Sequence, residues 1–311
     1  MKINRAEIKS IFLSLIVMAL WGSLFPFIKI GYEAFSIIGT DIPSILMFAG
    51  ERFTVCGIVI SLIAILKKDK IEPPRLKAVS MFLLIGLFSI VLHYAFTYIG
   101  LSSTDSSKTA LIKQLGSLLY VCFAFLFFKN ESFSIFKIIG AIVGFLGIVA
   151  INFTGGTVSF TLGDVLILMA SVCLVIANIF TKKIAANHSP FWLTGISQLS
   201  GGAILMLAAL TMGADVLAFD LYSLGVFAYI CTASTIAYVL WNYILKTSDL
   251  SNMFIIKFAE PLFACLFGAI LLGEDILKWQ YLIAFLLISA GIILGNVNFT
   301  KRERKVESKN I

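Results

Sequence analysis

Apolar segments of about 18 or more residues recur along this whole chain, separated by short charged or Gly/Pro-containing connections. At about 1.5 Å per residue, each segment is long enough to cross a hydrocarbon layer of roughly 30 Å as a helix. The sequence lacks the period-two alternation of a membrane barrel, and helices are the other way to pair the backbone inside lipid. With 59% of residues from the set AVILMFWYC and 13% charged, a water-soluble fold is excluded. The chain is predicted to be an all-α polytopic integral membrane protein.

About ten transmembrane helices are predicted. Their expected ranges are 11–31, 43–66, 78–100, 106–128, 134–152, 162–182, 191–213, 221–246, 251–272 and 276–297. The first run continues to about Ile30 without a small-residue cleavage site, so it is expected to be an uncleaved helix and not a secretory signal. Because the connections are short, no separate soluble domain is expected.

The distribution of charge predicts the orientation of these helices. If both termini are cytoplasmic, eighteen of the 24 Lys and Arg residues fall on the cytoplasmic side, where such residues concentrate. The outer loops then hold mainly acidic residues, among them Asp41, Asp215 and Asp220. The expected location is a cell membrane, and the net charge of +7 follows from this topology. The basic tail is expected to contact anionic lipid headgroups and not nucleic acid.

An internal repeat appears when the sequence is shifted by 144 residues. Tyr94 then aligns with Tyr238 and Lys113 aligns with Lys257. Since each half contributes five helices, an odd number, the second half is expected to be inverted relative to the first, which is a transporter architecture with its binding site near the midplane. The predicted units are a first repeat at 1–155, a second repeat at 156–300 and a basic cytoplasmic tail at 301–311.

Three motifs resemble a known family. The segment ALWGSLFPFIK, and FAEPLFACLFGAILLGEDILKWQ leading into SAGIILG, are similar to EamA-type members of the drug/metabolite transporter superfamily. The resemblance covers residues 10–298, although Gly116 and Ser117 stand where the first half would carry Glu-Pro. It implies a bundle of two inverted five-helix repeats that moves amino acids or other small metabolites, and it does not fix the substrate.

Ionisable residues inside the predicted helices are candidates for a functional site, because a charge at the bilayer centre costs at least about 2.5 to 3.5 kcal/mol. Lys113 and Lys257 are expected to flank the midplane and to bind an anionic group of the solute. The alternative is that Lys257 pairs with Glu260 on the same helical face and Lys113 pairs with Glu51. Both carboxylates are therefore also candidates for the site.

Two further ionisable residues have competing interpretations. Arg52 follows Glu51 directly, so the two side chains are about 100° apart on a helix, and at most one can point squarely into a cavity. Mutual neutralisation of the two charges is an equal alternative to a role in substrate binding or proton coupling. His93 is interpreted mainly as a hydrogen-bonded interior residue, with proton relay as the alternative.

Aromatic, amide and proline residues complete the candidate site. Tyr94, Tyr238, Trp241 and Asn242 offer an amphipathic surface for a small organic solute, although some of them could belong to an interfacial aromatic belt. Pro26 and Pro261 permit kinks that would line a cavity or serve gating. They could equally be ordinary bends of membrane helices.

Five glycines are expected to serve helix packing and not substrate binding. Gly140, Gly144 and Gly147 form one small-residue face, and Gly291 with Gly295 forms another.

Motifs of hydrolases, metalloproteases and ATP-driven pumps are absent from the sequence, so no enzyme activity, cofactor or metal is expected. The favoured function is a secondary transporter that moves an amino acid or other carboxylate-bearing solute by alternating access, with export as the expected direction. Proton or ion coupling and a monomeric or homodimeric state are compatible with it. The alternative is export of cationic or aromatic drug-like compounds through Glu51 or Glu260, and a non-transporting membrane enzyme or scaffold is more remote.

Overall fold

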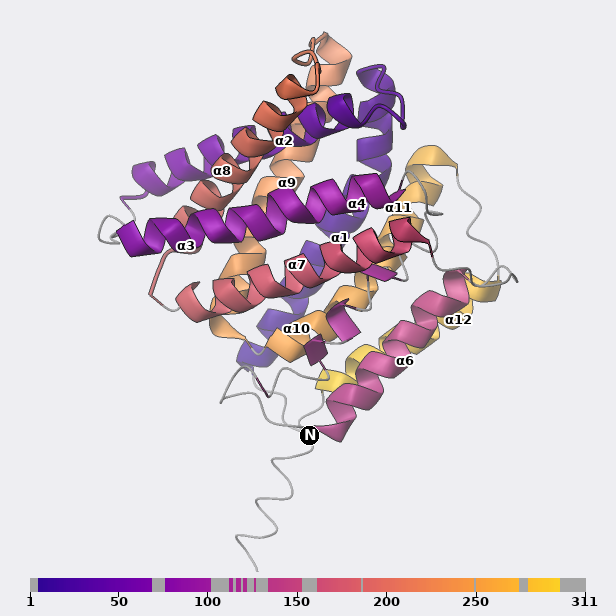
Figure 1. The fold of residues 1–311 in the computed structure, drawn as a ribbon. Coiled ribbons are helices and arrows are strands. Elements are labelled where there is room, and N and C mark those ends of the chain that lie inside the picture. The colour runs from indigo at the N-terminus through magenta and orange to yellow at the C-terminus, as the bar shows by residue number, and fades with distance from the viewer. Residues whose placement is uncertain are drawn as a thin grey trace, which may run out of the picture.

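The computed structural model describes residues 5–68, 76–101, 112–113, 116–118, 120–121, 126, 134–152, 161–185, 187–248, 250–273 and 279–296. Within these ranges the regular elements are all helical, as Figure 1 shows. The elements are α1 (Arg5–Ala34), α2 (Ile42–Leu66), α3 (Leu76–Gly86), the π-helical η1 (Leu87–Leu92), α4 (His93–Leu101), α6 (Ile135–Asn152), α7 (Leu162–Ala185), α8 (Pro190–Thr211), α9 (Leu221–Thr247), α10 (Leu250–Ile256), the 3₁₀-helical η2 (Lys257–Ala259), α11 (Glu260–Leu272) and α12 (Trp279–Asn296).

The prediction of a polytopic helical membrane fold is confirmed. Seven helical spans of the described chain are long and apolar enough to cross a membrane, and α6 and α12 contain shorter apolar stretches. Nine of the ten predicted segments coincide with described helices to within about six residues at each end. The remaining one, 106–128, lies mostly outside the described residues.

Local sequence signals explain where several helices begin and end. The side chain of Asp41 accepts a hydrogen bond from the backbone of Ser44 at the start of α2, and Ser189 caps α8 immediately before Pro190. Such side chains satisfy backbone N–H groups that a helix start leaves unpaired. At the other end of α11, Gly273 adopts a left-handed conformation with φ 67°, which an L side chain rarely adopts.

Two of the long spans are interrupted along their length. The six-residue π-helical stretch η1 separates α3 from α4, and the 3₁₀ turn η2 separates α10 from α11. Mid-helix π and 3₁₀ stretches commonly mark functional positions because they change the direction of side chains. Here His93 follows the first interruption and Lys257 opens the second.

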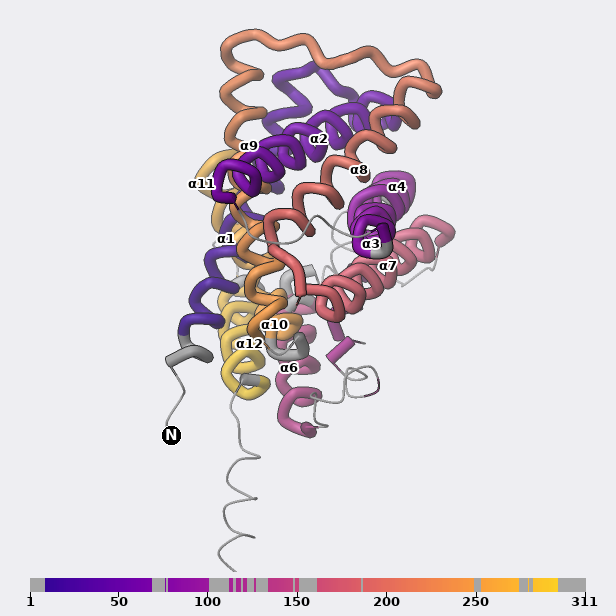
Figure 2. The backbone as a smooth tube through the Cα atoms, turned by 90° about the vertical axis from the view of Figure 1, so that its left-hand side faces the viewer, coloured from indigo at the N-terminus to yellow at the C-terminus, as the bar shows by residue number. Residues whose placement is uncertain are grey.

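Helices from the two predicted repeats pack against each other. The pairs with the most extensive contacts are α2 with α8, α6 with α12, and α1 with α9, and α4 packs on α7. The α2–α8 and α6–α12 pairs lie side by side in both Figure 1 and Figure 2.

Glycines permit the closest of these approaches. A Cβ placed on Gly57 of α2 would lie 2.3 Å from the backbone nitrogen of Leu199 in α8. The predicted glycine faces also meet, since a Cβ on Gly140 of α6 would lie 2.7 Å from the carbonyl oxygen of Gly291 and 2.6 Å from the nitrogen of Gly295 in α12. The sequence-based interpretation of these glycines as packing residues is therefore confirmed.

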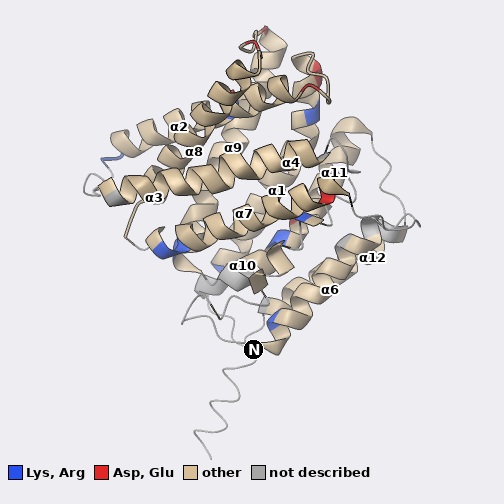
Figure 3. Ribbon diagram, viewed as in Figure 1, with Lys and Arg blue, Asp and Glu red and all other residues tan. Residues whose placement is uncertain are grey.

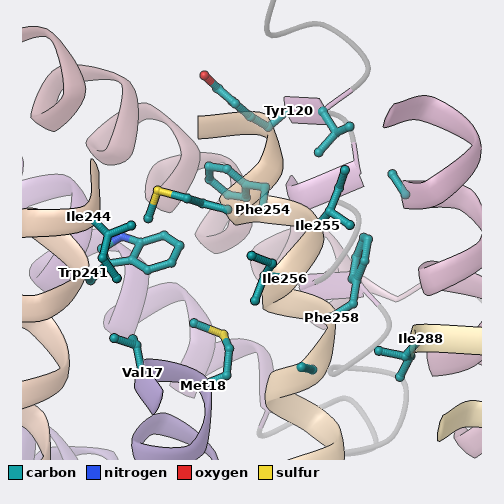
Figure 4. Packing of buried hydrophobic residues seen from close by; sticks show 14 of the residues in the cluster. Val17, Met18, Tyr120, Trp241, Ile244, Phe254, Ile255, Ile256, Phe258 and Ile288 are labelled. Carbon is teal, nitrogen blue, oxygen red and sulfur yellow. The ribbon is translucent and has the colours of Figure 1, made fainter. Parts of the chain in front are cut away.

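A hydrophobic cluster surrounds the second interruption. Figure 4 shows Phe254, Ile256 and Phe258 on the α10–η2 segment, with Trp241 and Ile288 contributed by other helices. Phe254 and Phe258 are at most 1% exposed, so the residues around Lys257 are fixed by packing. This packing gives the lysine a defined position in spite of its long side chain.

Opposite charges lie at opposite ends of the bundle. In Figure 3, acidic residues gather where α1 meets α2 and where α8 meets α9, connections that Asp41 and Asp220 flank. These two connections lie together, because the rings of Phe35 and Phe219 are 5.2 Å apart. At the other end, the ammonium group of Lys67 lies 4.6 Å from the ring centre of Phe191, at the start of α8.

Candidate functional site

A cavity of about 640 Å³ lies between the two predicted repeats. Residues from α1, α2, α3, η1, α4, α7, α8, α9, α10, η2 and α11 line it, and most of its wall is apolar or aromatic. Eleven of the twelve candidate residues named from the sequence line this cavity, and Glu51 is the exception. The eleven are Pro26, Arg52, His93, Tyr94, Lys113, Tyr238, Trp241, Asn242, Lys257, Glu260 and Pro261.

The two lysines and Glu260 form one charged region of the cavity, which we call the lysine pole. Lys257 is 6% exposed, and its ammonium nitrogen lies 5.3 Å from the ring centre of Trp21, 5.5 Å from that of Trp241 and 5.7 Å from that of Phe254. Rings at such distances stabilise a cation. The charge of Glu260 acts on both lysines, but no carboxylate of the described chain forms an ion pair with either.

Trp241 and Asn242 reach the cavity as members of a satisfied polar network. The indole N–H of Trp241 donates to the side-chain oxygen of Asn178 over 2.8 Å, and the Asn242 amide donates to the hydroxyl of Thr194 over 2.7 Å. These bonds join α9 to α7 and to α8. Both side chains are at most 8% exposed, so this arrangement favours the cavity wall over an interfacial belt.

Tyr94 and Tyr238 meet in the cavity. They are equivalent in the 144-residue repeat, and their hydroxyl oxygens are 3.5 Å apart. The ring of Tyr238 also packs edge-on against Trp21, with 5.5 Å between ring centres. Contact between a residue and its own repeat equivalent is expected only near the axis that relates the two halves.

Arg52 lines the cavity, and Glu51 does not. Arg52 is 1% exposed. Its Nη2 donates to the Tyr94 hydroxyl over 3.1 Å, and its guanidinium carbon lies 4.2 Å from the ring centre of Phe53. The carboxylate of Glu51 instead accepts a hydrogen bond from the backbone N–H of Leu217 over 2.9 Å. Thus only one of these adjacent residues faces the cavity, as their helical spacing requires.

His93 is held by the protein interior. Its ring Nδ1 lies 3.0 Å from the carbonyl oxygen of Ala170, so this nitrogen carries the proton and donates. The side chain is 5% exposed and lines the cavity. This geometry favours the interpretation of His93 as a hydrogen-bonded structural residue that joins α4 to α7.

The two prolines differ in their surroundings. Pro261 follows the 3₁₀ turn and occupies the first turn of α11, where a missing N–H costs little. Pro26 lies inside α1, which remains one helix from Arg5 to Ala34. Only Pro261 therefore coincides with an interruption of a span.

Sequence reasoning missed several uncharged polar residues of the wall. The most notable are Asn178 and Gln198, both buried and lining the cavity. Neither polar atom of the Gln198 side chain has a hydrogen-bond partner in the described structure. An amide in the middle of an apolar helix was the available signal, but the helical face that it occupies depends on packing.

Comparisons with known proteins agree with the fold. The EamA-like transporter family matches residues 8–153 and 161–297 of the chain. A solved crystal structure superimposes with a TM-score of 0.75 over 92% of this chain and 96% of its own, at 19% identity, which supports the fold alone.

Similar proteins occur in bacteria and archaea. The Escherichia coli protein named inner membrane transporter YedA is 25% identical over 88% of this chain and 87% of its own length. The Bacillus subtilis transporter YoaV is 26% identical over 92% and 96%, respectively. An Archaeoglobus fulgidus transporter is 25% identical over 84% and 91%. With both parts of the chain matched, this multi-pass membrane protein belongs to the EamA-like transporter family.

Proposed function

We propose that this transporter carries a small organic anion, an amino acid or other carboxylate-bearing metabolite, across the cell membrane. The observation that carries the proposal is the unbalanced charge of the cavity. Four cationic side chains line it, Lys29, Arg52, Lys113 and Lys257, and the one carboxylate among them in the described wall is Glu260. An excess of buried positive charge is costly, and an anionic solute would offset that cost.

The size and surface of the cavity support a small metabolite. Its volume of about 640 Å³ falls within the range of about 300 to 1,000 Å³ that is common for small-molecule sites. The wall is mainly apolar and aromatic, with a few polar groups that can orient a solute. A solute with an anionic group and a short apolar part matches these properties.

Alternating access of two inverted repeats is the mechanism that we propose. Gly50 of α2 faces Gly202 of α8, and Gly57 faces Gly195, so these equivalent helices run antiparallel. The α1–α9 pair corresponds under the repeat to the pairing of α7 with α3 and α4, and both pairings are present. These relations support an inverted repeat with the cavity near its axis.

We further propose that both termini are cytoplasmic and that the protein works as an exporter. The acidic end of the bundle would face outward and the basic end inward. Without a nucleotide-binding motif in the sequence, the driving force would be a gradient of the solute or of a coupled ion. No observation favours a second function, because the hydrogen bond to Leu217 occupies Glu51 and two lysines surround Glu260.

Transport by purified protein in lipid vesicles tests the proposal. Vesicles are loaded with unlabelled carboxylates, and uptake of the same labelled compounds is measured across a panel that also contains amines and aromatic cations. We expect counterflow of at least one carboxylate and none of the cations. Exchange of cations alone would refute the anion proposal.

Paired variants separate a binding role of the lysines from a structural one. Replacing Lys257 with Met keeps the apolar stem and removes the charge, so carboxylate flux should fall at least tenfold while the protein still folds. Lys183→Met, at an exposed site near the end of α7, is the matched control and should retain full flux.

The double variant Lys257→Met with Glu260→Gln decides between the two roles. If Lys257 only neutralises Glu260, removing both charges should restore transport. If it binds the solute, the double variant should fold and remain inactive.

A further inference from the structure

We propose that Arg52 forms a second anion-binding subsite and that the transported solute carries two carboxylates, one at Arg52 and one at the lysine pole. This inference rests on the proposed function and narrows its substrate class. It assigns a role to a buried cation that lies outside the lysine pair.

Arg52 has unused hydrogen-bonding capacity. Its guanidinium has five N–H donors, and the described structure shows one side-chain hydrogen bond, to the Tyr94 hydroxyl. The Nε atom is buried without a partner. A guanidinium can bind a carboxylate through two parallel hydrogen bonds, so a solute carboxylate is a suitable ligand for this site.

The carboxylate adjacent in sequence is engaged elsewhere. Glu51 is next to Arg52 in sequence, yet its carboxylate is directed to the α8–α9 connection and bonded to Leu217. No ion pair to Arg52 is present among the described residues. The groups that surround the guanidinium are phenols, since the hydroxyls of Tyr94, Tyr98 and Tyr238 act on it electrostatically. Neutral phenols can donate hydrogen bonds to a bound anion, and they do not take its place as the counter-charge of the guanidinium.

Aromatic side chains separate Arg52 from the lysine pole. A series of contacts leads from Arg52 to Tyr94, from Tyr94 to Tyr238, from the Tyr238 ring to Trp21, and from Trp21 to Lys257. Aromatic side chains therefore lie between the two cationic regions within one cavity. A solute with a carboxylate at each end and an apolar spacer would place its spacer against these rings.

Cations outnumber carboxylates in the cavity wall. At Arg52 and the lysine pole, three cations accompany the single carboxylate of Glu260. A fourth cation, Lys29, lines the cavity near the C-terminal end of α1 and has a separate interaction. The wall therefore has an excess of positive charge, which a dicarboxylate would offset more fully than a monocarboxylate.

Length-matched carboxylates test the inference in the same vesicles. Butyrate is compared with succinate, and valerate with glutarate, as competitors of labelled carboxylate counterflow. In the unmodified protein, one dicarboxylate should compete at a concentration at least tenfold lower than its monocarboxylate partner, a difference of about 1.4 kcal/mol. Equal competition by both members of each pair, with carboxylate flux intact, would overturn the inference and leave the proposed function standing. Absence of any carboxylate flux would refute both.

Variants at the two regions give a second, independent readout. Arg52→Gln should raise the dicarboxylate concentration needed for half-maximal competition to that of its monocarboxylate partner. The concentration needed for the monocarboxylate should not change. Lys257→Met should weaken competition by both compounds. Arg52→Lys should keep part of the preference for the dicarboxylate, because it keeps the positive charge. If Arg52→Gln folds and still prefers the dicarboxylate tenfold, the assignment of Arg52 is wrong. The comparison in the unmodified protein remains decisive even if this variant does not fold.

Discussion

The close approach of α2 and α8 leads to a quantitative prediction for Gly57→Ala. The added Cβ would lie 2.3 Å from the backbone nitrogen and 2.6 Å from the Cα of Leu199. Ordinary contacts begin at 3.4 Å, so the two helices would have to separate by about 1 Å. Because the opposing atoms belong to the backbone, no change of rotamer can relieve the clash.

A second glycine supplies the matched control for this variant. Gly225 lies in α9, and a Cβ added there meets nothing within 4 Å. Its replacement by Ala should only improve helix propensity, a gain of about 0.5 to 1 kcal/mol. Overpacking costs about 1 to 3 kcal/mol, and direct contact with backbone places Gly57→Ala near the upper end. The two variants should therefore differ by about 3 kcal/mol in free energy of unfolding.

Equilibrium unfolding in mixed detergent micelles, followed by circular dichroism, measures this difference. Gly202→Ala should behave like Gly57→Ala, because its Cβ would lie 2.4 Å from the backbone nitrogen of Thr54 on the same contact. If Gly57→Ala were as stable as Gly225→Ala, the α2–α8 packing described above would be wrong.

Two further predictions concern the ends of the helices. Hydrogen bonds from the hydroxyl and the backbone N–H of Ser223 lower the pKa of Asp220, so its stabilisation of α9 is full above the ordinary pKa of about 3.9 and is lost as pH falls through the lower folded value. The stability difference between the parent and Asp220→Ala should thus be constant above about pH 5 and shrink below pH 4; a difference that stays constant in acid would contradict this assignment. For topology, single cysteines in a cysteine-free background should react with an impermeant reagent from outside at position 215 and not at position 183. Labelling of position 183 in sealed cells would refute the proposed orientation.

The sequence by itself determined the fold class, because membrane insertion depends on local apolar length and not on distant contacts. The same reasoning located Lys113, Lys257 and Glu260, since a charge within an apolar run is costly wherever the run packs. The 144-residue repeat also made Tyr94 and Tyr238 equivalent positions, and the structure brings them into contact. Each of these properties can be read from one segment of the sequence, or from the alignment of two segments, without knowledge of the packing.

Only the tertiary structure decided which side chains face the cavity. The sequence favoured Glu51 over adjacent Arg52 as a site residue, and this choice was wrong for the cavity wall. The rotation of α2 against α8 turns Arg52 to the cavity, and Glu51 accepts a hydrogen bond from the backbone N–H of Leu217. The roles of Asn178 and Gln198 likewise depend on which face of α7 or α8 is turned inward. The interruptions at η1 and η2 were not predicted either. The orientation of a helix about its own axis is set by its neighbours, because in lipid an apolar pattern of similar strength surrounds the whole helix.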